Sequence, residues 1–349
     1  MKRILFIPFL GLLVIRFPAG CGNSDTETPG NSPEIPSIGA DAVYRAEGNV
    51  YGRAEMKAAE FVFGDLSNEP DMARFRAFTE ATGLAEKDLL GVVMCGSVTN
   101  LNMDDLSALT DVESLPLNIA FSLARPVTYD QYKAGVQALE DDPDGQYIDE
   151  ELAGSKVLKM ISSDDTKPVT FGALARDGKT VYIAFNRHEL SRTLSIEKSG
   201  QAEIVSEPLQ AAFARLADRA PMRVAIIIPE QVRATIREQI NEAKKEAGPL
   251  GGVLFSAFEP FVNLQSIGIA TYFSTNLVLD VVGDMKDPEN AADGKKGVAV
   301  IVASYQRMLM SRPDAPSINL ETAVQSEVKG KFLELKINLP EDAVEAVTP

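Results

Sequence analysis

The stretch Phe171–Glu189 reads FGALARDGKTVYIAFNRHE and contains two strand patterns, a turn between them and the start of a helix. Apolar and small residues dominate Val169–Ala175 and Thr180–Phe185, which predicts two strands. Asp177-Gly178 stands between these runs, and this dipeptide is typical of a tight β-hairpin turn. Asn186 follows with a Glu three residues later, a pattern that predicts a capped helix.

The same order recurs near the C-terminus in Val324–Glu341, with Gly330 at the turn and Asn338 at the position of the helix cap. The two Asn residues lie 338 − 186 = 152 positions apart. A duplicated unit is one interpretation of this correspondence. The other is that hairpins followed by a capped helix are common, and residue identity between the two stretches is thin.

Between and around these hairpins, the apolar residues follow the two-residue period of a strand in some segments and the ~3.6-residue period of a helix in others. The predicted strands are Asp88–Val98, Leu117–Leu123, Lys156–Ile161, Met222–Ile228, Ser266–Tyr272 and Leu277–Val282, with Thr322–Val328 and Lys331–Leu339 as the final hairpin. The predicted helices are Ala54–Phe63, Glu69–Thr82, Thr128–Leu139, Glu207–Ala217, Pro229–Ala247, Gly251–Val262 and Ala291–Met310. This order predicts an α+β fold of antiparallel sheets, with helices packed on one face and two halves that a duplication would explain. Gly248-Pro249 ends the long charged helix, so we expect one half at 41–247 and the other at 248–349.

The chain begins with a segment of a different kind. Lys2 and Arg3 precede the apolar run Ile4–Ile15, and Pro18-Ala19-Gly20-Cys21 follows. The run is shorter than the ~20 apolar residues that a membrane-spanning helix needs, which predicts a secretory signal over 1–20. Residues 21–40 are rich in Ser, Pro, Gly, Asn and Thr and therefore predict a flexible tether.

Ala19-Gly20-Cys21 resembles the lipobox of bacterial lipoproteins, in which cleavage precedes a cysteine that is then acylated. The resemblance implies that Cys21 is lipidated, that palmitate or similar chains anchor the protein to a membrane, and that it lies in the cell envelope, facing the periplasm or the cell surface. Gly22 stands where an Asp would signal retention in the inner membrane, which favours the outer membrane. The alternative is an ordinary signal followed by a coincidental cysteine. Beyond the lipobox, the order of elements resembles uncharacterised bacterial secreted proteins with repeated hairpin-plus-helix modules.

The net charge of the chain limits the kinds of partner that it can bind. The formal net charge is −16, and removing Lys2, Arg3 and Arg16 with the signal leaves 31 basic and 50 acidic residues, or −19. Such a surface repels phosphate backbones, so we expect no nucleic-acid partner. It also repels anionic lipid headgroups, so we expect the membrane to be reached through the acyl anchor.

An acidic stretch, Glu140–Glu151 (EDDPDGQYIDEE), matches the calcium loop of EF-hands in part. Glu140, Asp142, Asp144 and Glu151 take ligand positions one, three, five and twelve, and Gly145 takes position six. Hard cations prefer such oxygen ligands on a tightly turning loop. The alternative is a solvated acidic turn at Pro143-Asp144-Gly145. Calcium is the one cofactor that the sequence suggests.

Catalytic signals are weak. The single histidine, His188, lies at a predicted helix start, and no Gly-x-Ser-x-Gly motif is present. Cys95 lies in an apolar run and is expected to be a buried core residue. We therefore assign no catalytic residue and expect a non-enzymatic envelope lipoprotein that binds or scaffolds another component of the envelope, for which an envelope protein or an apolar ligand is a candidate. Two alternatives remain: a carrier with an apolar cavity between Val253–Val262 and Val298–Met310, and an envelope hydrolase that uses a pair of carboxyl groups.

Overall fold

The computed structural model describes residues 50–55, 77–96, 117–139, 144–164, 168–199, 207–216, 220–246, 252, 254–273, 276–311 and 318–340. The predicted signal, Cys21 and the predicted tether lie outside these residues. The chain forms two compact units, Met1–Ser206 (unit 1) and Glu207–Pro349 (unit 2). No helix in the described ranges is both long enough and apolar enough to cross a membrane.

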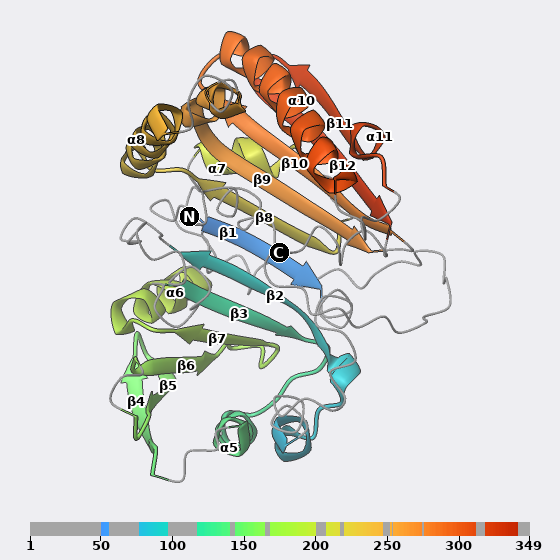
Figure 1. Cartoon of the computed structure of the whole chain (residues 1–349). Helices are drawn as coiled ribbons and strands as arrows, with labels where there is room; N and C mark the ends of the chain where they lie inside the picture. The colour runs from blue at the N-terminus through green and yellow to red at the C-terminus, as the bar shows by residue number, and fades with distance from the viewer. Residues whose placement is uncertain are drawn as a thin grey trace. The chain divides into compact units, whose positions relative to one another are not determined.

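The sheet of unit 1 runs through the lower part of Figure 1, and each pair of neighbouring strands is antiparallel. Its described strands, in spatial order, are β1 (Val50–Glu55), β2 (Leu89–Gly96), β3 (Leu117–Leu123), β7 (Thr180–Ala184), β6 (Thr170–Leu174), β5 (Ser155–Ile161) and β4 (Gln146–Leu152). Its described helices include η2 (Glu86–Asp88), α5 (Tyr129–Leu139) and α6 (Arg187–Ser199), and residues 77–82 are also helical.

Helices α5 and α6 cover opposite faces of this sheet. Tyr132 and Val136 of α5 belong to one buried cluster with Leu158 and Val181 of the sheet. On the other face, Asn118 of β3 donates a hydrogen bond to Thr193 of α6, 3.2 Å away. Because side chains alternate along a strand, the even-numbered and odd-numbered residues of β3 face different helices.

The hairpin β6–β7 has the predicted turn. Gly178 adopts a left-handed conformation with φ of +69°, which glycine tolerates without steric cost. The Oδ1 atom of Asn186 accepts a hydrogen bond from the backbone N–H of His188 at 2.9 Å, so the predicted cap of α6 is confirmed. At the start of α5, Thr128 and Gln131 exchange hydrogen bonds, which confirms the predicted capping box.

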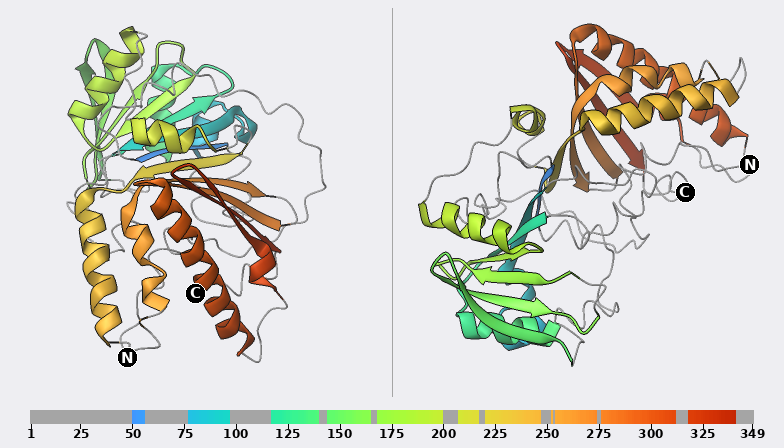
Figure 2. Two further views of the ribbon diagram at one scale, coloured as in Figure 1. Left: turned by 90° about the horizontal axis from the view of Figure 1, so that it is seen from above. Right: turned by 90° about the vertical axis from the view of Figure 1, so that its left-hand side faces the viewer.

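In unit 2, each pair of neighbouring strands is antiparallel as well. Its described strands, in spatial order, are β11 (Val324–Lys329), β12 (Phe332–Pro340), β10 (Asn276–Met285), β9 (Leu264–Phe273) and β8 (Met222–Ile227). Its described helices include α7 (Glu207–Phe213), α8 (Glu230–Glu246), η5 (Glu259–Asn263), α10 (Pro288–Met310) and α11 (Leu320–Ala323), and residues 254–256 are also helical. Figure 2 shows α7 on one side of this sheet and α8 and α10 on the other.

Glycines let the helices of unit 2 approach its sheet closely. A Cβ atom at Gly268 of β9 would lie 3.1 Å from a backbone oxygen of α7. On the opposite face, a Cβ atom at Gly294 of α10 would lie 3.1 Å from a methyl carbon of Leu333 in β12. Gly294 therefore serves close packing in this long helix, against the ordinary tendency of glycine to weaken helices.

The α+β class with antiparallel sheets is confirmed, but the helices of both units cover both faces rather than one. The expected division at 247/248 also differs from the observed one at 206/207, because β8 pairs with β9 and so belongs to unit 2. The predicted helix at Ala54–Phe63 starts too early, since Ala54 and Glu55 belong to β1, and its other residues lie outside the described ranges. Of the predicted helix Glu69–Thr82, only residues 77–82 are described, and they are helical.

The C-terminal hairpin differs from its prediction at its end. Strand β12 continues to Pro340, so Asn338 is a strand residue and not a helix cap. Its Oδ1 atom accepts a hydrogen bond from Asn276 of β10 at 2.9 Å, and this cross-strand partner was invisible in the local pattern. The proposed correspondence between the two hairpins therefore holds for their strands and turn glycines but fails at the second cap.

Candidate functional site

The acidic stretch that suggested calcium continues as strand β4. Residues 146–152 pair with β5, from Gln146 opposite Ile161 to Leu152 opposite Ser155. Asp144 lies in the preceding turn and Glu151 within the strand, both exposed, while Glu140 and Asp142 lie outside the described residues. In the described part of the chain, no group of three or more His, Cys, Asp or Glu side chains is placed to hold a metal ion. Calcium at this loop stays a prediction.

Two acids of β4 are instead engaged with basic side chains. Asp149 lies 2.7 Å from Lys133 of α5 and accepts a hydrogen bond from the Tyr129 hydroxyl at 3.0 Å. The hydrogen bond from Lys133 lowers the pKa of Asp149, and that from Tyr129 adds to the effect. Glu150 pairs with Arg187 of α6 at 3.3 Å, so the acids of this strand connect it to the helices on both faces.

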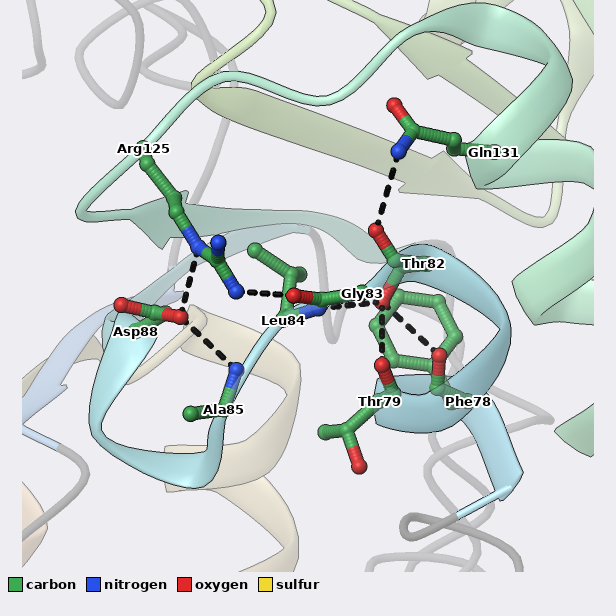
Figure 3. Close-up of polar contacts among 9 residues, drawn as sticks. All are labelled: Phe78, Thr79, Thr82, Gly83, Leu84, Ala85, Asp88, Arg125 and Gln131. Carbon is green, nitrogen blue, oxygen red and sulfur yellow. Dashed lines mark hydrogen bonds and ion pairs between the residues drawn. The ribbon is translucent and has the colours of Figure 1, made fainter.

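A second cluster of polar contacts joins the start of β2 to the β3–α5 connection (Figure 3). One carboxylate oxygen of Asp88 accepts hydrogen bonds from the backbone N–H of Ala85 at 2.7 Å and from Arg125 Nε at 2.8 Å. The same guanidinium group donates to the carbonyl of Gly83. The Ala85 N–H, followed by Arg125, lowers the pKa of Asp88 although burial opposes this shift. These contacts connect the segment before β2 to the β3–α5 connection. The Asp88 carboxylate is engaged in them and has a structural role.

The described carboxyl groups with a displaced pKa are not suited to be the general acid of a glycoside hydrolase. The pKa is lowered at Asp88, Asp149, Glu230 and Asp287, and in the described residues no carboxyl group has a displaced pKa that is raised. A general acid in such an enzyme needs a raised pKa. His188 is exposed in the first turn of α6, and Cys95 is fully buried in β2, as expected for a core residue.

Part of the space between η5 and α10, where an apolar carrier would need its cavity, is closed by a contact between two backbones. A Cβ atom on Gly297 would collide with the carbonyl oxygen of Ala257, so the two backbones are in contact there. A groove of about 460 Å³ lies beside this contact, and six of its ten lining residues are polar or charged. Its residues are Ser256, Ala257, Glu259, Pro260, Asn263, Asn290, Asp293, Lys296, Gly297 and Val300.

The apolar end of α10 is only partly buried. Leu309 and Val298 are buried, whereas Val300, Met308 and Met310 are 39%, 44% and 74% exposed. Val298 and Leu309 are eleven residues apart and share one buried face of the helix, whereas Met308 and Met310 lie outside that face.

A second groove, of about 500 Å³, lies at the end of the β11–β12 hairpin, and we call it the β12 groove. It is lined by Ile318, Asn319, Thr322, Ala323, Gln325, Lys336, Asn338 and Pro340. None of these eight residues is acidic, although the chain carries 50 acidic residues. Carbonyl, carboxylate or hydroxyl oxygens of a ligand would therefore meet no carboxylate in the lining.

Two local features shape the β12 groove. The pairing of β11 with β12 ends at Val324 opposite Ile337, while β12 continues for three more residues. The short helix α11 occupies the chain just before β11, capped by Asn319, whose Oδ1 atom accepts from the N–H of Glu321 at 3.0 Å. Gln306 of α10 fixes this helix by accepting from the Leu320 N–H and donating to the Ile318 carbonyl.

Sequence reasoning did not single out the β12 groove. The alternation in Lys331–Leu339 places Lys336 and Asn338 on the same face of a strand, and this was the one available signal. The groove depends on the different lengths of β11 and β12 and on α11, which the sequence assigned in part to a strand. A register between strands is decided by side-chain burial and turn geometry together, so it was not visible locally.

No protein-family model matches the sequence, and no curated protein is similar to it. Among solved structures, crystal form III of a protein named TP0453 aligns with a TM-score of 0.46 at 9% identity, covering 88% of this chain and 96% of that one. Crystal form I of TP0453 aligns with a TM-score of 0.42 at 11% identity, covering 88% and 95%. Similarity at this level carries no argument about function.

Proposed function

We propose that this protein is a non-enzymatic lipoprotein of the cell envelope, anchored through Cys21, whose folded part binds or scaffolds another envelope component. The anchor follows from the lipobox-like Ala19-Gly20-Cys21 after the apolar run. Lipoproteins of this kind carry more than one acyl chain, and two chains give stable anchoring where one gives only marginal binding. Gly22 favours the outer membrane in this proposal.

The observation that carries the binding role is the β12 groove, whose lining is polar and lacks acidic residues on a strongly acidic protein. A surface groove of this kind suits a partner rich in hydrogen-bond acceptors. The groove beside the contact of Gly297 with Ala257 has six polar or charged residues among its ten lining residues, which favours a polar partner over an apolar ligand. Asp88 and Asp149, whose carboxyl pKa values are lowered, do not suit the role of the general acid in a hydrolase.

The anchor is tested by labelling. The full chain is expressed in a bacterium fed with radioactive palmitate, and membranes are partitioned between Triton X-114 and water. We expect label on the wild type, partition into detergent, and loss of both in Cys21→Ser. Mass spectrometry of the N-terminal peptide should show an acylated Cys21. A wild type that is processed, unlabelled and recovered in the aqueous phase would contradict the anchor, and separation of the two membranes on a sucrose gradient tests its placement.

A further inference from the structure

We propose that the β12 groove binds an extended peptide segment of a partner protein, which adds as a short strand beside residues 338–340 and places an acidic side chain next to Lys336. This inference rests on the proposed binding role and names the class of partner. It follows from the backbone of β12, from the donors that line the groove and from their charge.

The free edge of β12 provides the pairing surface. Asn338, Leu339 and Pro340 pair with β10 on one side, opposite Val278, Leu277 and Asn276. On the other side, no strand in the described part of the chain pairs with them, because β11 starts opposite Ile337. Backbone groups of alternate residues in an antiparallel strand point away from a given neighbour, so this stretch offers hydrogen bonds to a further strand. Pro340 has no N–H and can contribute only its carbonyl oxygen. Its length of three residues corresponds to ~10 Å of extended peptide.

The side chains around this edge mainly offer donors. The Oδ1 atoms of Asn319 and Asn338 already accept hydrogen bonds, from Glu321 N and Asn276 Nδ2, which leaves the amide N–H groups for a ligand. The amide of Gln325 has no partner among the described residues, and it stands opposite Lys336 in the register. Donors arranged in this way suit the carbonyl oxygens of a peptide and a carboxylate.

Lys336 provides the charge. It is exposed and has no ion pair within the described ranges, whereas Lys329 of the same hairpin pairs with Glu334 at 2.6 Å and Glu327 at 3.3 Å. Lys336 and Asn338 lie on the same face of β12, two residues apart. An acidic residue of the added strand opposite Asn338 would therefore lie within reach of the Lys336 ammonium group, and a basic residue there would be repelled.

The test uses the full chain in detergent micelles and fluorescein-labelled pentapeptides, Ala-Val-Glu-Val-Ala and its versions with central Gln or Lys. Fluorescence anisotropy measures binding. We expect the Glu peptide to bind ~10-fold more tightly than the Lys peptide, as one charge-assisted hydrogen bond implies. Lys336→Gln should reduce that ratio to below ~2-fold, and the matched variant Lys329→Gln should leave it unchanged. Circular dichroism verifies that both variants are folded.

A second peptide set separates strand addition from simple charge attraction. N-methylation of the backbone amides of the Glu peptide removes its donors and keeps its side chain, and we expect it to weaken binding at least ~10-fold. Absence of saturable binding at millimolar peptide, equal affinity for the three peptides, or insensitivity to N-methylation would each overturn the inference. Palmitate labelling is independent of these results: a labelled protein that ignores the peptides refutes only the groove, and an unlabelled protein that binds them refutes only the anchor.

Discussion

The hairpins β6–β7 and β11–β12 share two strands and a turn glycine with positive φ, yet their surroundings differ. The turn of the first is enclosed: a Cβ atom at Gly178 would lie 2.8 Å from the carbonyl oxygen of Val127. The turn of the second is open, with nothing within 4 Å of a Cβ atom at Gly330. Both strands of the first hairpin have outer partners, β3 and β5, whereas β11 ends its sheet within the described residues.

This difference shows how one local pattern can serve two purposes. The enclosed hairpin is an interior part of its sheet, and its turn receives the β3–α5 connection through hydrogen bonds from Leu123 N to Lys179 O and from Val127 N to Gly178 O. The open hairpin leaves part of β12 unpaired on one side and so supplies the proposed binding edge. The following variants test the comparison, beginning with the largest expected effect.

Gly178→Ala should destabilise the protein by about 3 kcal/mol, because the left-handed conformation and the collision with Val127 both oppose a side chain. Gly330→Ala is the matched control and should cost only about 1 kcal/mol, since conformation alone opposes it. Urea unfolding followed by circular dichroism measures both. Equal costs would show that the enclosure of the first turn has no energetic consequence.

Lys331→Ala should destabilise the second hairpin at its turn by about 2–3 kcal/mol. Lys331 lies 2.9 Å from Asp284 of β10, whose side chain is only 1% exposed, and removal of the cation leaves a buried charge without compensation. The double variant Asp284→Asn with Lys331→Ala should recover part of the loss, which thermal unfolding can measure. If Lys331→Ala alone is as stable as the wild type, the ion pair with Asp284 does not stabilise the second hairpin.

Asp88→Asn should weaken the contacts that hold the β3–α5 connection beside the β6–β7 turn. We expect it to lower the free energy of unfolding by about 1–2 kcal/mol at neutral pH. The folded-state pKa of Asp88 is lowered, so its contribution is fully present above the unfolded value of about 3.9 and is lost as the pH falls through the lower folded pKa. The difference between variant and wild type should therefore shrink as the pH falls below about 4. Urea titrations at several pH values measure it, and a constant difference would contradict the role of the carboxylate charge.

Asn186→Ala should cost about 1 kcal/mol, because it removes the cap of α6. Asn338→Ala should change stability by no more than about 0.5 kcal/mol, since it removes one exposed hydrogen bond between side chains. Hydrogen exchange of the first turn of α6 measures the local effect of the first variant. A loss of about 1 kcal/mol in Asn338→Ala as well would show that the two Asn residues contribute equally to stability.

The sequence predicted much of the fold and little of the candidate site. Strands β3, β6 and β7 and helix α5 were expected nearly at their observed limits, because alternation, Asp177-Gly178 and the Thr128–Gln131 pair act within a few residues. Strand β4 was missed because its acids resemble a solvated loop until Lys133 and Arg187 are placed beside them. The η5 region was predicted as one helix, but Pro260 lies in a 3-10 helix there and the contact of Ala257 with Gly297 decides its course.

The sequence by itself determined the turn glycines, the caps of α5 and α6, the antiparallel α+β class and the expectation of an anchor at Cys21, since each depends on short-range patterns. Only the tertiary structure decided that one hairpin is enclosed and the other forms an edge. It also decided that β12 continues past β11, and that Lys336 has no ion pair in the described ranges while Lys329 has two. These properties depend on strand register and on contacts between residues far apart in the chain, which local periodicity does not encode.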